Sequence, residues 1–166
     1  MEALERAQRI LDDVTERTLA EVPPGAVLFD AHTHLGEDID GMRGHPEELL
    51  AMFDRVGITS SFTFCLDEPD RVPAFTAAND RTLAYAAESP DRIVPFVRLD
   101  LDQDPIEEAR RCLDLGARGI KLHPRAQKFS LGDERLDNVF ALAVERDVPI
   151  LIHGGRGLPP IGDHLA

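Results

Sequence analysis

Apolar and polar residues alternate along this chain with two different periods, which predict helices and strands in turn. Between residues 2 and 20 the apolar positions recur every three or four residues, as on one face of a helix. From residue 26 onward, short β-rich runs alternate with longer helical stretches. The predicted strands span residues 26–32, 58–66, 93–97, 119–123 and 148–153. The predicted helices run from Pro46 to Gly57, over about 74–88, from Pro105 to near Gly116, and from Asp133 to about Val144.

Proline and glycine divide the chain into its parts. Proline stands where two of the predicted helices begin and glycine where they end, which is the usual asymmetry of helix termini. The segment Val22-Pro23-Pro24-Gly25 ends the first helix and precedes the first strand. We therefore expect residues 1–24 to form an N-terminal helix and linker, and residues 25–166 to form one barrel-type domain.

Strands that alternate with single helices indicate parallel βα units, which build either an open doubly wound sheet or a (β/α)8 barrel. No glycine-rich phosphate-binding sequence follows the first strand, as a dinucleotide-binding sheet requires. Polar residues follow several strands instead, where barrel enzymes hold their catalytic groups. The predicted fold is therefore α/β, a TIM-type (β/α)8 barrel. A full barrel takes about 250 residues, so we expect an N-terminal helix and about five βα units of an incomplete barrel, in a chain that is cut short.

The most informative motif is Leu28-Phe29-Asp30-Ala31-His32-Thr33-His34, an apolar strand that ends in two histidines. Successive side chains of a strand point to opposite faces, so His32 and His34 are expected on one side, with Asp30 in line behind them. Two imidazoles that project together can chelate a metal ion, with zinc favoured.

Two further histidines, His123 and His153, follow other predicted strands. Alternation puts Lys121 on the face of His123, so these groups are expected to converge on one mouth of the barrel. A site of His32, His34 and His153 would provide three neutral nitrogen ligands and leave a position open for water or substrate. The alternative for each is a hydrogen-bonded structural histidine.

Five polar residues are candidates for contacting substrate or supporting the metal ligands: Asp30, Arg98, Lys121, His123 and Arg156. Asp30 can orient a ligand histidine or close a turn. Lys121 is interpreted as a substrate-binding cation, an electrophile, a carboxylated metal bridge, or one partner of an ion pair in the mouth. Arg98 and Arg156 can clamp a substrate carboxylate or lie in ordinary surface salt bridges.

Composition excludes several other functions. The net charge is −13 and no basic cluster occurs, which argues against binding to nucleic acids or to anionic membranes. The apolar runs are too short to span a bilayer, and the N-terminus lacks the pattern of a signal peptide. Cys65 and Cys112 are predicted to be buried, reduced thiols, as in a cytoplasmic protein.

Three motifs in this order resemble the amidohydrolase superfamily, in its amidohydrolase-2 (amidohydrolase-related) branch, which also contains decarboxylases. The motifs are Phe29-Asp30-Ala31-His32-Thr33-His34-Leu35-Gly36, Gly119-Ile120-Lys121-Leu122-His123-Pro124 and Pro149-Ile150-Leu151-Ile152-His153-Gly154-Gly155. The resemblance implies that His32, His34 and His153 bind a divalent metal, usually zinc. The family also uses a histidine after strand six and an aspartate after strand eight, and this sequence provides neither.

The resemblance implies a metal-dependent hydrolase, in which a metal-activated water attacks a C–N or C–O bond of a small molecule. For these 166 residues alone we expect weak or no activity. One alternative is a metal-dependent decarboxylase of the same branch. Another is a non-enzymatic metal-binding fragment, assembled as a homo-oligomer or with a missing C-terminal half across its open sheet edge. A metal-dependent nuclease or phosphoesterase is disfavoured by the Lys-Leu-His-Pro sequence and by the acidity of the chain.

Overall fold

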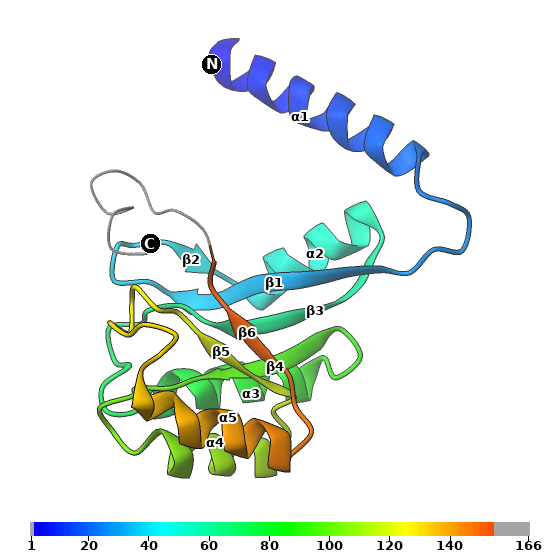
Figure 1. Ribbon diagram of the computed structural model, residues 1–166. Coiled ribbons are helices and arrows are strands. Elements are labelled where there is room, and N and C mark those ends of the chain that lie inside the picture. Colours follow the sequence, from blue (N-terminus) through cyan, green and yellow to red (C-terminus); the bar gives the residue numbers. More distant parts are fainter. Residues whose placement is uncertain (1, 155–166) are drawn as a thin grey trace.

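The computed structural model describes residues 2–154, and these form a mixed α/β half-barrel (Figure 1). Its 6-stranded sheet has the order β2-β1-β3-β4-β5-β6, in which β2 is the two-residue strand Arg43–Gly44 at one edge. The parallel strands are β1 (Leu28–Glu37), β3 (Ile58–Cys65), β4 (Ile93–Arg98), β5 (Gly119–Leu122) and β6 (Ile150–Ile152). The helices are α1 (Glu2–Ala20), α2 (Pro46–Val56), α3 (Thr76–Glu88), α4 (Pro105–Asp114) and α5 (Asp137–Glu145). The prediction of an incomplete barrel of βα units is confirmed.

Local sequence signals explain where the helices begin and end. Gly57 takes the left-handed conformation, with φ 77°, and its N–H bonds to the carbonyl of Phe53 at the end of α2. At the start of α4, the Asp104 side chain accepts the N–H of Glu107. Asp133 also acts as a cap, because its side chain accepts the N–H of Arg135. There the first turn is a 3-10 helix, Glu134–Leu136, before α5 begins.

Strand β1 differs from the prediction in length and in regularity. It continues to Glu37, because its last residues pair with the short antiparallel strand β2 (Arg43–Gly44), which the sequence pattern did not reveal. Asp30 pairs with Ser61 of β3 and Thr33 with Thr63, so β1 contains one extra residue between these pairs. This bulge breaks the alternation of side chains. The expectation that Asp30 stands in line behind both histidines is therefore wrong.

The outer face of the sheet packs against helices α3, α4 and α5 (Figure 1). On β5, Ile120 and Leu122 are fully buried in the largest hydrophobic cluster. Val139 of α5 and Leu136, the last residue of the turn before α5, belong to the same cluster. The predicted parity of this strand is confirmed, since its apolar residues face the helices. Both cysteines, Cys65 and Cys112, are buried and free, as the sequence predicted.

The opposite, inner face carries a row of aromatic rings across three strands. The ring of Phe62 lies 4.6 Å from that of Phe29 and 4.4 Å from that of Phe96, measured between centroids. The row ends at Gly119 of β5, where a Cβ atom would lie 2.5 Å from the ring of Phe96. Only glycine therefore leaves room for this ring, and the aromatic row forms a floor beneath the carboxyl ends of the strands.

Helix α1 lies apart from the sheet (Figure 1). Its apolar stripe, which predicted the helix, is largely exposed: Leu4 has 80% of its surface accessible and Leu11 60%. Among residues 2–154, no helix is both long and apolar enough to cross a bilayer.

Candidate functional site

The two histidines of β1 lie together on the inner side of the sheet. Their ring centroids are 5.0 Å apart, and the ring of Phe64 on β3 lies 5.0 Å from His32 and 4.5 Å from His34. The Asp30 carboxylate accepts the backbone N–H of His32 at 2.9 Å. Asp30 thus closes the bulge that brings both imidazoles against the same ring.

Burial and neighbouring charge keep this pair neutral. Burial, followed by the charges of His32 and Lys121, lowers the pKa of His34 to about 3. The pKa of His32 is lowered by burial first and then by the charges of Lys121 and His153, against a smaller opposing effect of Asp30. Both imidazoles therefore carry a free nitrogen lone pair at neutral pH, which is the form that binds metal ions.

A second pair of histidines stands at the ends of β5 and β6. The rings of His123 and His153 are stacked, with centroids 3.9 Å apart and an interplanar angle of 10°. The N–H of His153 bonds to the carbonyl of Leu122, which extends the pairing of the two strands. Burial and then the charge of His153 lower the pKa of His123 to about 4, so this pair is also neutral at pH 7.

The donor chemistry of these histidines fits a divalent metal, but the described residues do not complete a site. Neutral imidazole nitrogens are ligands that zinc favours. In residues 2–154, however, no group of three or more His, Cys, Asp or Glu side chains is arranged to hold an ion. His153 lies against His123 and does not join His32 and His34 in a three-ligand set. Arg156, another predicted site residue, lies outside the described residues.

Lys121 is the most deeply buried charged group of the site. Only 1% of its surface is exposed, and its Nζ lies 4.8 Å from the centroid of the Phe64 ring. Within residues 2–154 this nitrogen has no hydrogen-bond partner and no salt bridge. Burial, and then the charge of Arg98, lower the pKa of Lys121 to about 8. The ion pair considered for Lys121 is thus absent from the part of the chain that the structure describes.

Arg98 is the register partner of Lys121 on the neighbouring strand β4. It is 4% exposed, and its Nη2 lies 2.8 Å from the Oδ1 of Asp67. Its guanidinium also lies over the ring of Phe75, 4.7 Å from the centroid. Asp67 was not singled out from the sequence. Its position just after the apolar strand β3 is the same signal that identified the histidines, namely a polar residue that follows a strand.

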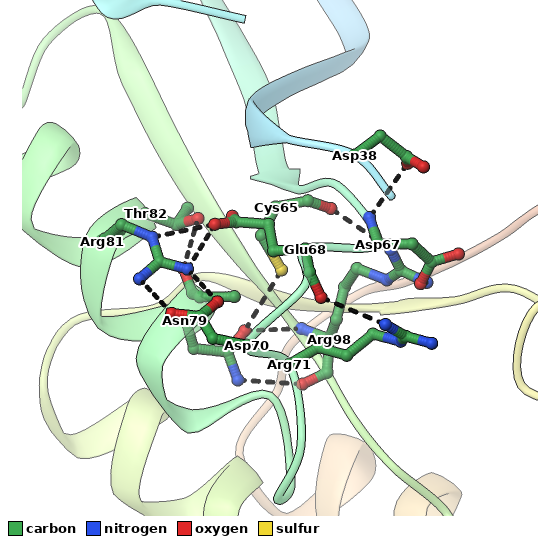
Figure 2. A network of polar contacts seen from close by, with 11 residues as sticks. Asp38, Cys65, Asp67, Glu68, Asp70, Arg71, Asn79, Arg81, Thr82 and Arg98 are labelled. Atoms are coloured by element: carbon green, nitrogen blue, oxygen red, sulfur yellow. Dashed lines mark hydrogen bonds and ion pairs between the residues drawn. The ribbon is translucent and has the colours of Figure 1, made fainter. Parts of the chain in front are cut away.

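Asn79 of α3 holds the backbone of Arg98 in place (Figure 2). Its Oδ1 accepts the N–H of Arg98 at 3.0 Å, and its Nδ2 donates to the carbonyl of Arg98 at 2.9 Å. The same Nδ2 donates to the Oε1 of Glu108 on α4 at 2.8 Å. On the rim nearby, Arg81 bridges the carboxylates of Glu68 and Asp70 (Figure 2).

Three solved structures resemble this chain at low sequence identity. An amidohydrolase II matches with a TM-score of 0.60 and 21% identity, over 80% of this chain and 53% of its own. A probable 2-pyrone-4,6-dicarboxylic acid hydrolase from Acinetobacter baumannii, with citric acid bound, has a TM-score of 0.56 and 14% identity, over 78% and 50%. The 4-oxalomesaconate hydratase of Rhodopseudomonas palustris has a TM-score of 0.58 and 16% identity, over 76% and 52%. These likenesses establish the fold, and the chain spans about half the length of each structure.

A shorter sequence match points to a different enzyme. Over 66 residues the chain is 38% identical to pyridoxine 5'-phosphate synthase from Xanthomonas axonopodis pv. citri (strain 306), covering 38% of this chain and 25% of that protein. The family model of the amidohydrolases (Amidohydro_2) matches far more of the sequence, residues 29–166. That segment holds both histidine pairs, Lys121 and Arg98. The chain therefore belongs to the amidohydrolase family.

Proposed function

We propose that this chain provides the metal-binding part of the active site of a metal-dependent hydrolase acting on a small molecule. The observation that carries the proposal is the pair His32 and His34, two neutral imidazoles held against Phe64 on the inner face of an amidohydrolase half-barrel. His153, which follows β6 and lies close enough to affect the pKa of His32, is the proposed third ligand, and metal binding would require its ring to turn away from His123. Zinc is the metal that this donor set favours.

The residues of the chain have distinct roles in this proposal. A bound divalent ion would supply Lewis acidity and lower the pKa of a coordinated water. Asp30 fixes the backbone of the bulge through the N–H of His32, and Phe64 limits the rotation of both rings by packing against them. Because both pKa values are lowered, the imidazoles need not lose protons to bind metal at pH 7.

Zinc titration of the purified chain, followed by calorimetry, tests this proposal. We expect one ion per chain, and we expect His32→Ala and His34→Ala each to weaken binding at least about tenfold, as for loss of a ligand or its support. His153→Ala tests the proposed third ligand in the same way. The matched control is His45→Ala, because His45 is an exposed histidine that precedes α2 and belongs to neither pair.

The control and the variants together decide the outcome. If the wild-type chain binds zinc no more tightly than His32→Ala, the metal site is refuted. If His45→Ala weakens binding as much as His34→Ala, the zinc lies elsewhere. Turnover by the 166-residue chain is expected to be weak or absent, and turnover abolished by a chelator and by His32→Ala would overturn that expectation.

A further inference from the structure

Within residues 2–154, the inner face of the sheet contains more buried positive charge than negative charge. Lys121 and Arg98 are register neighbours on β5 and β4, and they are 1% and 4% exposed. Asp67 lies 2.8 Å from Arg98 and compensates that charge. In the part of the chain that the structure describes, Lys121 has no carboxylate within salt-bridge distance. Buried charges are ordinarily paired, so this one requires an explanation.

The groups around Lys121 do not provide a counter-charge. The Phe64 ring lies 4.8 Å from the Lys121 Nζ, and its face attracts a cation without neutralising it. The charged side chain beside Lys121 is Arg98, which is also positive. The Nε of Arg98 likewise has no hydrogen-bond partner within residues 2–154. The surrounding histidines are neutral at pH 7 and add no negative charge.

The position of Lys121 is central to the site. Two residues beyond it on β5 is His123, which stacks on His153. On the other side, the Phe64 ring that contacts Lys121 also contacts His32 and His34. The ammonium group therefore lies between the two histidine pairs, close enough to lower the pKa of all four imidazoles.

We propose that Lys121, with Arg98 beside it, binds a carboxylate group of the substrate, so that the substrate belongs to the class of small organic carboxylate anions. Among residues 2–154 of the metal-free chain, Lys121, Arg98 and Asp67 leave a surplus of one positive charge, which a single carboxylate group neutralises. A phosphate monoester places up to two negative charges on one group and requires more donors at that point, whereas each carboxylate group carries one. The identification of this anion as a substrate rests on the proposed function, whereas binding of the anion requires no metal.

The lysines themselves provide the test, because the chain has only Lys121 and Lys128. In metal-free protein labelled with 13C-lysine, each lysine gives one Cε signal in an NMR spectrum. Titration with succinate is expected to shift the Lys121 signal saturably and to leave the signal of the exposed Lys128 unchanged. Succinamide, the neutral analogue of the same length, is expected to shift neither, and inorganic phosphate to bind more weakly than succinate.

Variants test whether the lysine carries the binding. Lys121→Met is expected to weaken succinate binding at least about tenfold, since it removes a charge-assisted hydrogen bond. Lys128→Met makes the same chemical change on the surface and should have no effect. The proposal is overturned if succinate produces no saturable Lys121 shift, if succinamide or phosphate binds equally well, or if Lys121→Met binds like the wild type. Should Lys121→Met fail to fold, the comparison of succinate with succinamide on the wild-type chain still decides.

Failure of this inference is distinguishable from failure of the metal site. A chain that binds zinc but shows no saturable succinate binding keeps the proposed function and refutes the carboxylate site. A chain that binds succinate through Lys121 but does not bind zinc gives the opposite result. His32→Ala is expected to lose zinc while its succinate affinity stays within about threefold of the wild type, well below the effect of a lost charged contact.

Discussion

Polar groups are deeply buried on both sides of the sheet, but they differ in whether their hydrogen bonds are satisfied. On the outer face, Glu108 is 5% exposed and its carboxylate accepts bonds from Asn79, Arg111 and Thr76. On the inner face Lys121 is 1% exposed, and in residues 2–154 its ammonium group has no partner. Satisfied polar groups hold the elements of a fold together, whereas unsatisfied ones cost stability.

This difference separates residues that maintain the fold from residues for which we propose a ligand. Asn79 and Glu108 join α3, β4 and α4, so their bonds stabilise the arrangement of these elements. The inner face combines four neutral imidazoles with a cation that has no partner within residues 2–154, an arrangement that has no evident benefit for stability. Clusters of this kind, with perturbed pKa values, are typical of functional sites.

The strongest test of the comparison uses two adjacent residues of β5. Ile120 is fully buried against the helices, and Lys121 is 1% exposed on the inner face. We expect Ile120→Ala to lower the free energy of unfolding by about 3 kcal/mol, because it leaves a cavity in the core. Lys121→Met should change it by less than about 1 kcal/mol, or raise it, since an unpaired buried charge is removed. Urea denaturation measures the free energy of unfolding of both variants. An equal decrease in the two would show that Lys121 is a structural residue.

A smaller effect is expected where the outer face is held by hydrogen bonds. Asn79→Ala should cost about 2 kcal/mol, because it leaves the backbone N–H and C=O of Arg98 without their bonds. Its neighbour Asp80 forms an exposed ion pair with Arg111, so Asp80→Ala should cost less than about 1 kcal/mol. The same denaturation experiment compares them. Equal costs would mean that the network around Asn79 does not stabilise the fold.

The smallest expected effect concerns the pH dependence of the inner face. The pKa of His34 is lowered to about 3, whereas an unfolded histidine titrates near 6.5. Below pH 6.5 the unfolded chain therefore takes up a proton that the folded chain does not. The stability from this group is present above pH 6.5 and is lost as the pH falls toward 3.

In metal-free protein, the wild type is expected to lose about 1 kcal/mol more stability than His34→Asn between pH 7 and about pH 5.7. Urea denaturation at several pH values measures this difference. If the free energy of unfolding depends on pH in the same way in the two proteins, His34 is not held neutral by the fold. The proposed difference between the two faces of the sheet would then be contradicted at this residue.

Much of the architecture was predictable because it depends on local rules. The predicted strand over 58–66 is β3, Ile58–Cys65, and the helix from Pro46 to Gly57 is α2, Pro46–Val56. Apolar periodicity, proline and glycine mark such elements regardless of what they pack against. The bulge in β1 was not predictable, because it arises from the register between this strand and β3.

The sequence by itself determined the five helices, the five parallel strands and the facing of residues on the regular strand β5, since strand alternation and helix periodicity are properties of neighbouring residues. It thereby identified both histidine pairs, Lys121 and Arg98. Only the tertiary structure decided that Asp30 bonds to a backbone amide, that Arg98 pairs with Asp67 and that Lys121 lies without a described partner. Such contacts join side chains from different strands, and their geometry depends on register and twist, which no local pattern specifies.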